Sequence, residues 1–357
     1  MTKTDVLIIG GSASGLATAI SGKSTYPEKE FLLIRKEEKV MVPCGIPYMF
    51  GSLESNEKNV MPTDAAYDKV GVKHKVGEVS AIDKDRKVAV LADGEEISFE
   101  KLVIATGSTP SKPKWLKGAD LERVYVIPKN KVYLDKMKEE IGCCKKIAVV
   151  GGGFIGVEIS DELNKQDNDV SLIEIRDTIL TAAFGKELAT RAQEALQERG
   201  VKIHAGKGIA EIKGKDGKAA SLTLEDGTSL DVDAVVLAMG YAPNSELAEK
   251  AGLQMARNNF VWVDEYMRTD HPDIFAVGDC AEKRNFITRR QTQTMLASTA
   301  CAEGRIAGMN LFRTSAIKTF SGTIAIYSTV IGEHAFGTAG ITETDARQEG
   351  FDVVSGI

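Results

Sequence analysis

The sequence predicts an α/β protein in which one βαβ unit for a dinucleotide occurs twice. Each copy opens with a short apolar strand, a glycine-rich loop and a helix, at residues 6–22 and 147–164. Apolar strands around a helix indicate a buried parallel sheet. The copies have similar lengths, from Gly10 to Gly107 and from Gly151 to Gly240, which is typical of an internal duplication.

The first copy begins with a strand at residues 6–9 and the loop Gly10-Gly11-Ser12-Ala13-Ser14-Gly15. A helix over about 16–22 and a second strand at 31–34 follow. Turn residues at 83–86 and 93–94 predict a meander between residues 75 and 104. This copy closes in Ala105-Thr106-Gly107.

The second copy repeats this order. A strand at 147–150 leads into Gly151-Gly152-Gly153-Phe154-Ile155-Gly156, a helix to about residue 164 and a strand at 170–174. Another meander closes in a strand at 235–239 and Gly240. The proline-containing segment 112–117 is the expected boundary between the copies.

Beyond Gly240, an apolar strand at 274–277 ends in Gly278-Asp279, and a helix is expected over 292–310. The tail from residue 319 has the pattern of a strand, a turn and the start of a helix. So few residues make a poor domain unaided, so we expect an incomplete or partner-supported module.

Composition excludes several classes of function. The 357 residues are 43% apolar and 27% charged, and the net charge of −6 is spread without a basic stripe, so no nucleic-acid partner is expected. No apolar run approaches the roughly 18 residues of a membrane span. We expect no signal peptide, and the sequence has no CxxC pair. The five cysteines suggest a reducing cytoplasm, and the four histidines lack metal-ligand spacing.

The second loop carries the stronger motif. In Gly151-x-Gly153-x-x-Gly156 the glycines permit close approach of a pyrophosphate, and the helix start offers it free N–H groups. Glu174 stands where an acid accepts hydrogen bonds from the adenine ribose, which favours NADH. Arg176 nearby leaves NADPH as an alternative, and a turn without a ligand is the other reading.

The first loop is weaker by itself. Ser12 occupies the place of the middle glycine, and Arg35 and Lys36 stand where a ribose-binding acid is expected, although Glu37 or Glu38 could substitute. A dinucleotide site and a structural turn are equally compatible with this loop.

The motifs together resemble the pyridine nucleotide-disulfide oxidoreductase family of flavoproteins. The resemblance is carried by the paired loops, Ala105-Thr106-Gly107, Gly240 with Pro243-Asn244, and Gly278-Asp279. It implies a glutathione-reductase-like fold with two Rossmann-like domains and an incomplete C-terminal α+β interface domain. The implied domains are FAD-binding (1–111 and 240–318), NAD(P)H-binding (112–239) and the beginning of the interface domain (319–357).

The resemblance also implies site residues. Asp279 would bind the ribityl chain of FAD, and the backbone near Val79 would bind its adenine. The implied FAD set is Gly10, Ser12, Ala13, Ser14, Gly15, Arg35, Lys36, Val79, Ala105, Thr106, Gly107, Gly278, Asp279, Leu296 and Ala297. The implied NAD(P)H set is Gly151, Gly153, Phe154, Ile155, Gly156, Glu174 and Gly240. Phe154 would gate the flavin face, with Glu158 close by as a catalytic candidate.

Cys44, in Pro43-Cys44-Gly45-Ile46-Pro47-Tyr48, resembles the redox cysteine of the single-cysteine branch of this family. That branch contains coenzyme A disulfide reductases, persulfide and polysulfide reductases, NADH oxidases and NADH peroxidases. Its peroxidases and water-forming oxidases have a histidine where this chain has Ala13. Splitting a disulfide expels a less basic group than splitting a peroxide, so sulfur chemistry fits better. The alternative for Cys44 is a buried structural thiol.

The resulting hypothesis is hydride transfer from NADH through FAD to a disulfide or persulfide at Cys44. The expected acceptors are a small disulfide, a polysulfide or a coenzyme A derivative, for which Lys23 is the one phosphate-binding candidate. The alternatives are an NADH oxidase, a reductase of rubredoxin or ferredoxin, and a redox sensor without turnover. The family suggests a homodimer, which the short tail makes doubtful.

Overall fold

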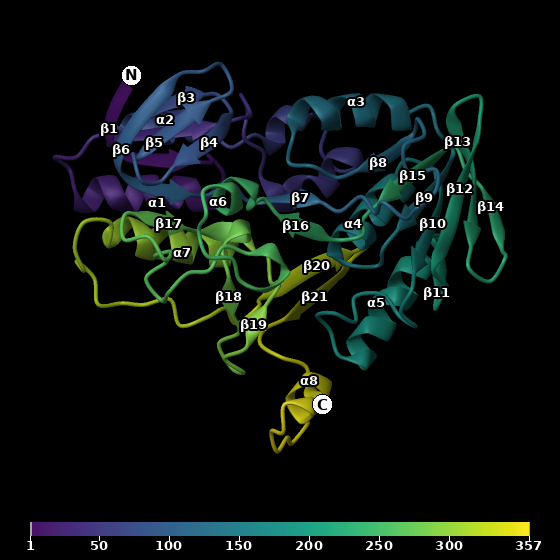
Figure 1. Ribbon diagram of the computed structural model, residues 1–357. Coiled ribbons are helices and arrows are strands. Elements are labelled where there is room, and N and C mark those ends of the chain that lie inside the picture. The colour runs from purple at the N-terminus through teal and green to yellow at the C-terminus, as the bar shows by residue number, and fades with distance from the viewer. Residues whose placement is uncertain (1, 357) are drawn as a thin grey trace. The chain divides into compact units, whose positions relative to one another are not determined.

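The computed structural model describes residues 2–356, which form two compact units (Figure 1). Three stretches of chain build each unit: Met1–Val40, Met61–Thr109 and Pro243–Ala325 in unit 1, and Met41–Val60, Pro110–Ala242 and Ile326–Ile357 in unit 2. The short strands β7 (Ser108–Pro110) and β16 (Tyr241–Pro243) contain two of the points where the chain passes from one unit to the other. Cys44 and the tail therefore belong to the same unit as the second glycine loop.

Unit 1 contains a mixed sheet in the order β3-β2-β1-β6-β5-β4, with β17 also paired to β6. Its strands are β1 (Thr2–Ile9), β2 (Phe31–Arg35), β3 (Lys73–Val76), β4 (Val79–Asp83), β5 (Val88–Leu91), β6 (Glu96–Ile104) and β17 (Ile274–Ala276). The pairs around β1, β2, β3 and β17 are parallel, and β4, β5 and β6 form an antiparallel meander. Every residue of β2 is buried, as expected for a central parallel strand.

The helices of unit 1 are α1 (Ala13–Thr25), α2 (Thr63–Val70), α6 (Glu246–Lys250) and α7 (Ala297–Met309). Small residues let α7 pack closely on α1: a Cβ added at Gly304 would lie 2.5 Å from the Ser14 carbonyl oxygen. Smaller elements are the strands β18 (Lys283–Arg284) and β19 (Gln291–Thr292) and the 3₁₀ helices η4 (Arg257–Asn259) and η5 (Gly278–Cys280). The packing of α7 on α1 brings η5 next to the first glycine loop.

Unit 2 contains a parallel sheet in the order β11-β10-β9-β15-β8. The strands are β8 (Val124–Val126), β9 (Lys146–Val150), β10 (Asp169–Glu174), β11 (Lys202–Ala205) and β15 (Ala234–Leu237), and the helices are α3 (Lys131–Ile141), α4 (Phe154–Asn164) and α5 (Lys186–Glu198). An antiparallel sheet comprises β12 (Ile209–Lys215), β13 (Lys218–Leu224) and β14 (Ser229–Asp231). The two units thus each contain parallel strands, the first of which leads into a glycine loop and a helix.

Two further segments complete unit 2. The first holds the 3₁₀ helices η1 (Pro43–Gly45), η2 (Pro47–Phe50) and η3 (Asn56–Asn59), and the tail holds the hairpin β20 (Tyr327–Ile331) and β21 (His334–Thr338), followed by α8 (Glu343–Gln348). Met49 and Phe50 from the first segment, and Ile331 and Phe336 from the tail, are buried in the core that surrounds α4. Both segments are therefore integral parts of this unit.

Two helices differ from the sequence-based expectation. α1 extends beyond 16–22 at both ends, because Ala13 and Ser14 already form its first turn. α7 begins five residues later than expected, because Gln291 and Thr292 pair with β18 and Leu296 has extended backbone. The later start makes Leu296 the N-cap residue of α7.

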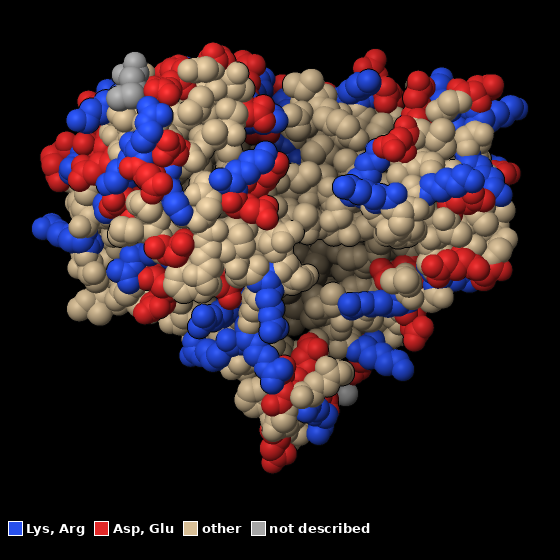
Figure 2. Space-filling model, viewed as in Figure 1, with Lys and Arg blue, Asp and Glu red and all other residues tan. Residues whose placement is uncertain are grey.

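The surface carries both signs of charge. On the face that Figure 2 shows, Lys and Arg side chains are interspersed with Asp and Glu. Within residues 2–356 we find no helix with the length and apolar character that crossing a bilayer requires.

Candidate active site

The first glycine loop joins β1 to α1 in unit 1. Gly10 has a φ of 113°, and a Cβ there would lie 2.1 Å from the Ala105 carbonyl oxygen, so the turn requires glycine. A Cβ at Gly15 would lie 1.9 Å from the Gly10 carbonyl oxygen. Ser12 is the N-cap of α1, its side chain caps no helix N–H, and the first turn has no acidic residue. The N–H groups at this helix start fit a pyrophosphate, as FAD requires.

The closing strand of the first copy ends beside this loop. The Ala105 N–H donates to the Ile9 carbonyl at the end of β1 over 2.8 Å. Thr106 Oγ1 donates to the Asn244 carbonyl over 2.5 Å, and the Asn244 N–H donates to the Gly107 carbonyl over 2.9 Å. The Thr106-Gly107 and Pro243-Asn244 motifs are therefore bonded to each other.

The Gly278–Asp279 turn also reaches the first loop. Gly278 has a φ of 78°, and a Cβ there would lie 2.5 Å from Ser14 Oγ on α1. Asp279 Oδ2 accepts a hydrogen bond from Ser108 Oγ at 2.7 Å. Leu296, the N-cap of α7, also provides no side-chain cap. Unit 1 thus brings together the loop, the closing strand and the aspartate named from the sequence.

Arg35 and Lys36 lie at the end of β2. The Arg35 side chain is 4% exposed, and its guanidinium donates to Asp64 Oδ1 over 2.6 Å and to the carbonyls of Glu37 and Glu38. This hydrogen bond to Arg35 holds the pKa of Asp64 below its usual value. Arg35 therefore packs against the loop as part of a buried network: a Cβ at Gly11 would lie 3.0 Å from Arg35 Cδ.

Two further residues of the FAD set, Lys36 and Val79, lie after β2 and at the start of β4. Lys36 is exposed and forms an ion pair with Glu78 at 2.7 Å. Val79 is buried at the start of β4. Lys36 is thus accessible at the surface, whereas Val79 can offer a ligand only its backbone.

The second glycine loop joins β9 to α4 in unit 2. A Cβ at Gly151 would lie 2.4 Å from the Ala238 carbonyl oxygen, and one at Gly156 would lie 1.8 Å from the Gly151 carbonyl oxygen. Gly153 is different: its φ is −77°, and nothing lies within 4 Å of an added Cβ. The fold requires the first and third glycines, while the space beside Gly153 is open for a dinucleotide. Ile155, in the first turn of α4, packs against the core.

Glu174 lies at the end of β10, beside this loop. Its Oε2 accepts a hydrogen bond from the Gly152 N–H at 2.6 Å, and its Oε1 accepts one from the Arg176 N–H at 2.8 Å. Gly240, with a φ of 90°, follows β15, and nothing lies within 4 Å of a Cβ there. The acid, the helix start and the closing glycine are therefore arranged as a nucleotide site needs them.

Cys44 is exposed in η1 of unit 2. The turn around it is fixed by the buried Asn59, whose Nδ2 donates to the Val42 carbonyl over 3.1 Å. A Cβ at Gly45 would lie 1.9 Å from Asn59 Oδ1. The thiol is thus presented at the surface of this unit by a well-packed turn, which excludes a buried structural thiol.

One face of α4 contacts both added segments of unit 2. Phe154, Glu158 and Glu162 are spaced four residues apart, so they lie along one side of the helix. Phe154 stacks on Tyr327 of β20 with ring centroids 5.1 Å apart, and Glu158 Oε1 accepts a hydrogen bond from Thr329 Oγ1 at 2.9 Å. The helix therefore holds the tail hairpin through an aromatic and a polar contact.

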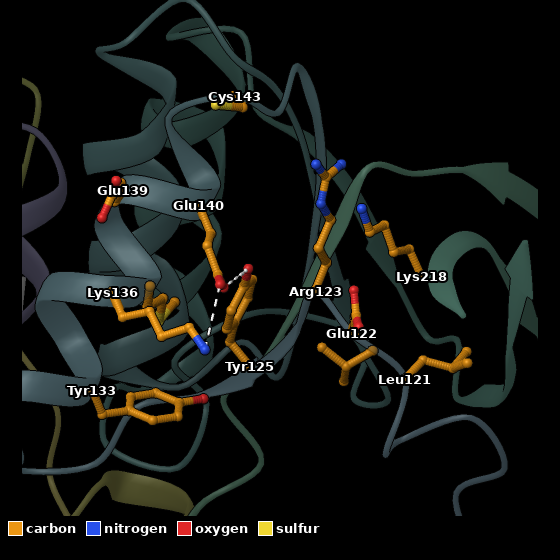
Figure 3. Close-up of a pocket in the computed structure, with 12 residues that line it drawn as sticks. Leu121, Glu122, Arg123, Tyr125, Tyr133, Lys136, Glu139, Glu140, Cys143 and Lys218 are labelled. Carbon is orange, nitrogen blue, oxygen red and sulfur yellow. Dashed lines mark hydrogen bonds and ion pairs between the residues drawn. The ribbon is translucent and has the colours of Figure 1, made fainter. Parts of the chain in front are cut away.

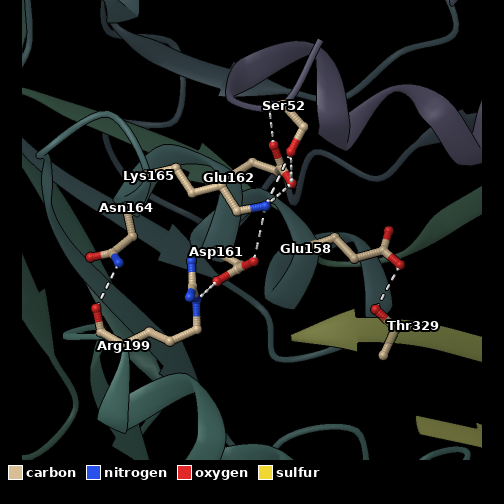
Figure 4. Close-up of polar contacts among 8 residues, drawn as sticks. All are labelled: Ser52, Glu158, Asp161, Glu162, Asn164, Lys165, Arg199 and Thr329. Carbon is tan, nitrogen blue, oxygen red and sulfur yellow. Dashed lines mark hydrogen bonds and ion pairs between the residues drawn. The ribbon is translucent and has the colours of Figure 1, made fainter. Parts of the chain in front are cut away.

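The same face holds the segment that carries Cys44 (Figure 4). The buried Glu162 accepts hydrogen bonds from the Ser52 N–H at 2.5 Å and from Ser52 Oγ at 2.9 Å, and Lys165 Nζ lies 2.6 Å from its Oε1. Next to it, the buried Asp161 pairs with Arg199 and with Lys165. These pairs compensate the negative charges of the two buried carboxylates, and the bonds from Ser52 fix the Cys44 segment on α4.

Glu158 and Tyr48 are two titratable groups of unit 2 that interact through charge. Burial raises the pKa of Glu158 to about 7, against the opposing hydrogen bond from Thr329. Burial also raises the pKa of the Tyr48 phenol, and the negative charges of Glu158, Glu162, Asp161 and Cys44 raise it further. Glu158 thus changes its protonation state near neutral pH, within electrostatic reach of Tyr48.

Sequence reasoning missed several residues of this arrangement. Tyr48 stands in the motif around Cys44, but no role is predicted for it from the sequence. Tyr327, Thr329 and Glu162 carry no motif, because their partners lie more than 100 residues away along the chain. The spacing of Glu162 from Glu158 along a helix was the one local signal.

A separate cavity of about 700 Å³ lies between β8, α3 and β13 (Figure 3). Glu140 joins Tyr125 at 2.7 Å and Lys136 at 3.6 Å within it. The residues that line it include none of those named from the sequence for FAD, NAD(P)H or sulfur. Among residues 2–356, no group of three or more His, Cys, Asp or Glu side chains is placed to bind a metal ion.

Comparisons with known proteins agree with this geometry. Residues 4–304 match the family described as pyridine nucleotide-disulphide oxidoreductase. The chain is 34% identical to an NADH oxidase of Methanocaldococcus jannaschii and 30% identical to an NAD(P)H coenzyme A polysulfide/persulfide reductase of Pyrococcus horikoshii. Each alignment covers 98% of this chain and 79% of the relative.

Solved structures show the same relationship. An NAD-dependent persulfide reductase from A. fulgidus superimposes with a TM-score of 0.91 at 29% identity, over 98% of this chain and 66% of that protein. A water-forming NADH oxidase from Lactobacillus brevis, bound to NADH, shares the fold with a TM-score of 0.90 at 24% identity, over 97% of this chain and 77% of that one. This chain belongs to the pyridine nucleotide-disulfide oxidoreductase family, with its FAD-dependent, NAD(P)H-oxidising chemistry.

Proposed function

We propose that this protein uses NADH to reduce a small sulfur compound at Cys44, with a coenzyme A persulfide, disulfide or polysulfide as the acceptor. The observation that carries the proposal is the exposed Cys44 thiol on a turn anchored to α4, within electrostatic reach of Tyr48. Two of the relatives named above support the sulfur acceptor, since their names describe persulfide reductases.

The two glycine loops would divide the cofactors between them. We assign FAD to residues 1–111 and 240–318, with its pyrophosphate at the start of α1 and its ribityl chain at Asp279. NADH is assigned to residues 112–239, with its pyrophosphate at the start of α4 and its adenine ribose at Glu174. FAD held at the start of α1 would supply the redox chemistry that links the nicotinamide to sulfur.

The sulfur steps balance around Cys44. Its thiolate attacks the outer sulfur of the persulfide R–S–SH, the S–S bond breaks, and RS⁻ leaves while Cys44 retains –S–SH. A hydride equivalent then cleaves the Cys44 S–S bond, which releases H₂S and restores the thiolate. Overall, NADH and RSSH give NAD⁺, RSH and HS⁻.

Glu158 and Tyr48 are the proposed proton source for the leaving sulfur. A carboxyl group with a pKa of about 7 is substantially protonated at neutral pH, and its Oε1 is held by Thr329. The leaving RS⁻ takes a proton from this pair, and H₂S returns one on its way to HS⁻. Acid–base assistance is most effective when the pKa of the group is near the working pH.

Replacement of the nucleophile tests the proposal. Cys44→Ser should reduce NADH-dependent persulfide reduction by about 1,000-fold or more, because serine cannot form the persulfide. Reduction of ferricyanide by NADH, which needs no thiol, should continue. Cys143→Ser, at another exposed cysteine of unit 2, is the matched control. Full persulfide turnover by Cys44→Ser would contradict the role of Cys44.

NADH oxidase activity is the second candidate, favoured by the 34% identity to the Methanocaldococcus jannaschii enzyme. It predicts rapid oxygen uptake with NADH alone, in the absence of any sulfur compound. We expect slow uptake, because Ala13 stands where water-forming oxidases of this branch have histidine.

None of the five cysteines forms a disulfide within residues 2–356, which supports the cytoplasm as the proposed location.

A further inference from the structure

A buried ion pair lies directly behind the Gly278–Asp279 turn of unit 1. Lys283 on β18 and Glu303 on α7 are 1% and 0% exposed, and Lys283 Nζ lies 3.7 Å from Glu303 Oε1. Such a pair adds little to stability, because both ions lose their hydration on burial. Glu303 Oε1 also has no hydrogen-bond partner among the described residues. The presence of this ion pair therefore indicates a role other than stabilising the core.

Both members of the pair bind the backbone of one residue. Glu303 Oε2 accepts a hydrogen bond from the Gly278 N–H at 2.7 Å, and Lys283 Nζ donates to the Gly278 carbonyl. Lys283 Nζ also donates to the Ala281 carbonyl over 3.0 Å. The Glu303 carboxylate thus binds the N–H of Gly278, and the Lys283 ammonium binds its carbonyl. Both peptide groups that flank Gly278 are therefore fixed in orientation.

The fixed residue must be glycine and is closely packed. Gly278 has a φ of 78° and lies against Ser14 at the start of α1, where the pyrophosphate of FAD is assigned. The next residue is Asp279, whose carboxylate accepts from Ser108. A small rotation at Gly278 would displace the Asp279 carboxylate, since the two residues share a peptide bond.

We propose that Lys283 and Glu303 are positioning residues that hold Asp279 in the orientation needed to retain FAD. The inference depends on the FAD role of Asp279 given under the proposed function. Neither Lys283 nor Glu303 belongs to a motif named from the sequence.

Two double variants separate this role from a structural one. Lys283→Met/Glu303→Gln and Lys283→Met/Glu303→Leu both remove the charges, but only the first keeps an oxygen that can accept from the Gly278 N–H. The wild type should retain FAD most tightly. The dissociation constant of FAD should be about tenfold higher for the Leu double variant than for the Gln double variant, as expected for loss of one buried hydrogen bond.

FAD release on dilution of each holoenzyme, followed by flavin fluorescence, gives the affinity, and far-ultraviolet melting of the same samples gives the stability. Asn310→Ala, at the other end of α7, is the control: it breaks a hydrogen bond to the Ala316 N–H and should lower the melting temperature without loosening FAD. Equal FAD release by the wild type and both double variants would overturn the proposal.

Hydrogen exchange of the wild type provides a test that needs no variant. If the pair sets the turn, the Gly278 amide should be protected with and without FAD. Rapid exchange without FAD would mean that the cofactor orders the turn, which contradicts the proposal. A wild type that binds no FAD would instead refute the proposed function, and the exchange result would still report on the pair.

Discussion

Glu158 links stability to pH at the scale of a single residue. Its pKa is about 7 in the folded chain against 4.5 for an ordinary glutamate, because the carboxyl is buried. Between these values the folded state holds more protons than the unfolded state, so the free energy of unfolding falls as pH rises from 4.5 to 7. Glu158→Gln should abolish this contribution and be more stable than the wild type at pH 8, by about 3 kcal/mol.

Urea denaturation at pH 4.5 and pH 8 measures the difference. Gln retains an oxygen for the Thr329 hydroxyl, so the comparison isolates the charge. Equal stability changes at both pH values would show that burial does not perturb the pKa of this carboxyl.

Thr329→Val should raise the pKa of Glu158 further, since the lost hydrogen bond favours the ionised form.

Glu174 should decide between the two nicotinamide cofactors. Glu174→Ala removes the acceptor for the adenine ribose hydroxyls and the repulsion of a 2′-phosphate. The KM for NADH should rise about tenfold, as for loss of a hydrogen bond to a charged group, while the KM for NADPH falls. Steady-state kinetics with both cofactors test this, with Glu211→Ala as the control, since this half-buried glutamate of β12 pairs with Lys213 instead of a glycine loop. An unchanged ratio of the KM for NADH to the KM for NADPH would show that the adenine ribose does not bind at Glu174.

At the scale of an element, the loop before α4 separates glycines needed for folding from glycines needed for binding. Gly153→Ala meets no atom within 4 Å and has ordinary backbone, so the melting temperature should stay the same. The KM for NADH should rise about tenfold, because the new methyl group occupies the space of the pyrophosphate. Gly156→Ala should instead unfold unit 2, since its Cβ would lie 1.8 Å from a carbonyl oxygen.

Thermal melting and NADH titration of both variants distinguish the two effects. A large loss of stability in Gly153→Ala would contradict the open space beside that residue.

Elements of this kind were predictable because their signal is local. The strand, glycine loop and helix at residues 147–164 follow from apolar runs and glycine spacing, and the structure has them at nearly those bounds. The start of α7 was not predictable, because it depends on the pairing of β18 with β19. Nor was the network of Arg35 on β2, since its partner Asp64 lies on α2, far away along the chain.

At the scale of the whole molecule, the tail hairpin is part of unit 2. Deletion of residues 326–357 would expose the core around Ile331 and Phe336 and remove Tyr327 from Phe154. Unit 2 should lose about 3 kcal/mol or more, while FAD binding by unit 1 persists. Deletion of residues 343–357 is the control, because no residue of α8 is buried.

Far-ultraviolet and flavin signals should then melt at separate temperatures in the longer deletion only. Coincident melting of both signals in the longer deletion would show that FAD retention depends on the hairpin.

The sequence could not have placed residues 41–60 or 326–357 in unit 2. These segments join α4 through contacts between positions far apart along the chain, such as Ser52 with Glu162, and no periodicity predicts such pairs. The duplicated βαβ pattern therefore predicts the sheets, while the position of Cys44 depends on side chains that no motif includes.

The spacing of Phe154, Glu158 and Glu162 along α4 makes that helix intolerant of changes in length. Each added residue rotates everything after it by about 100°. One inserted alanine between Phe154 and Glu158 would turn Glu158 and Glu162 away from their partners Thr329 and Ser52, although no native side chain is lost. Natural relatives with this layout should therefore vary in the identity of residues along α4 but keep its register free of insertions.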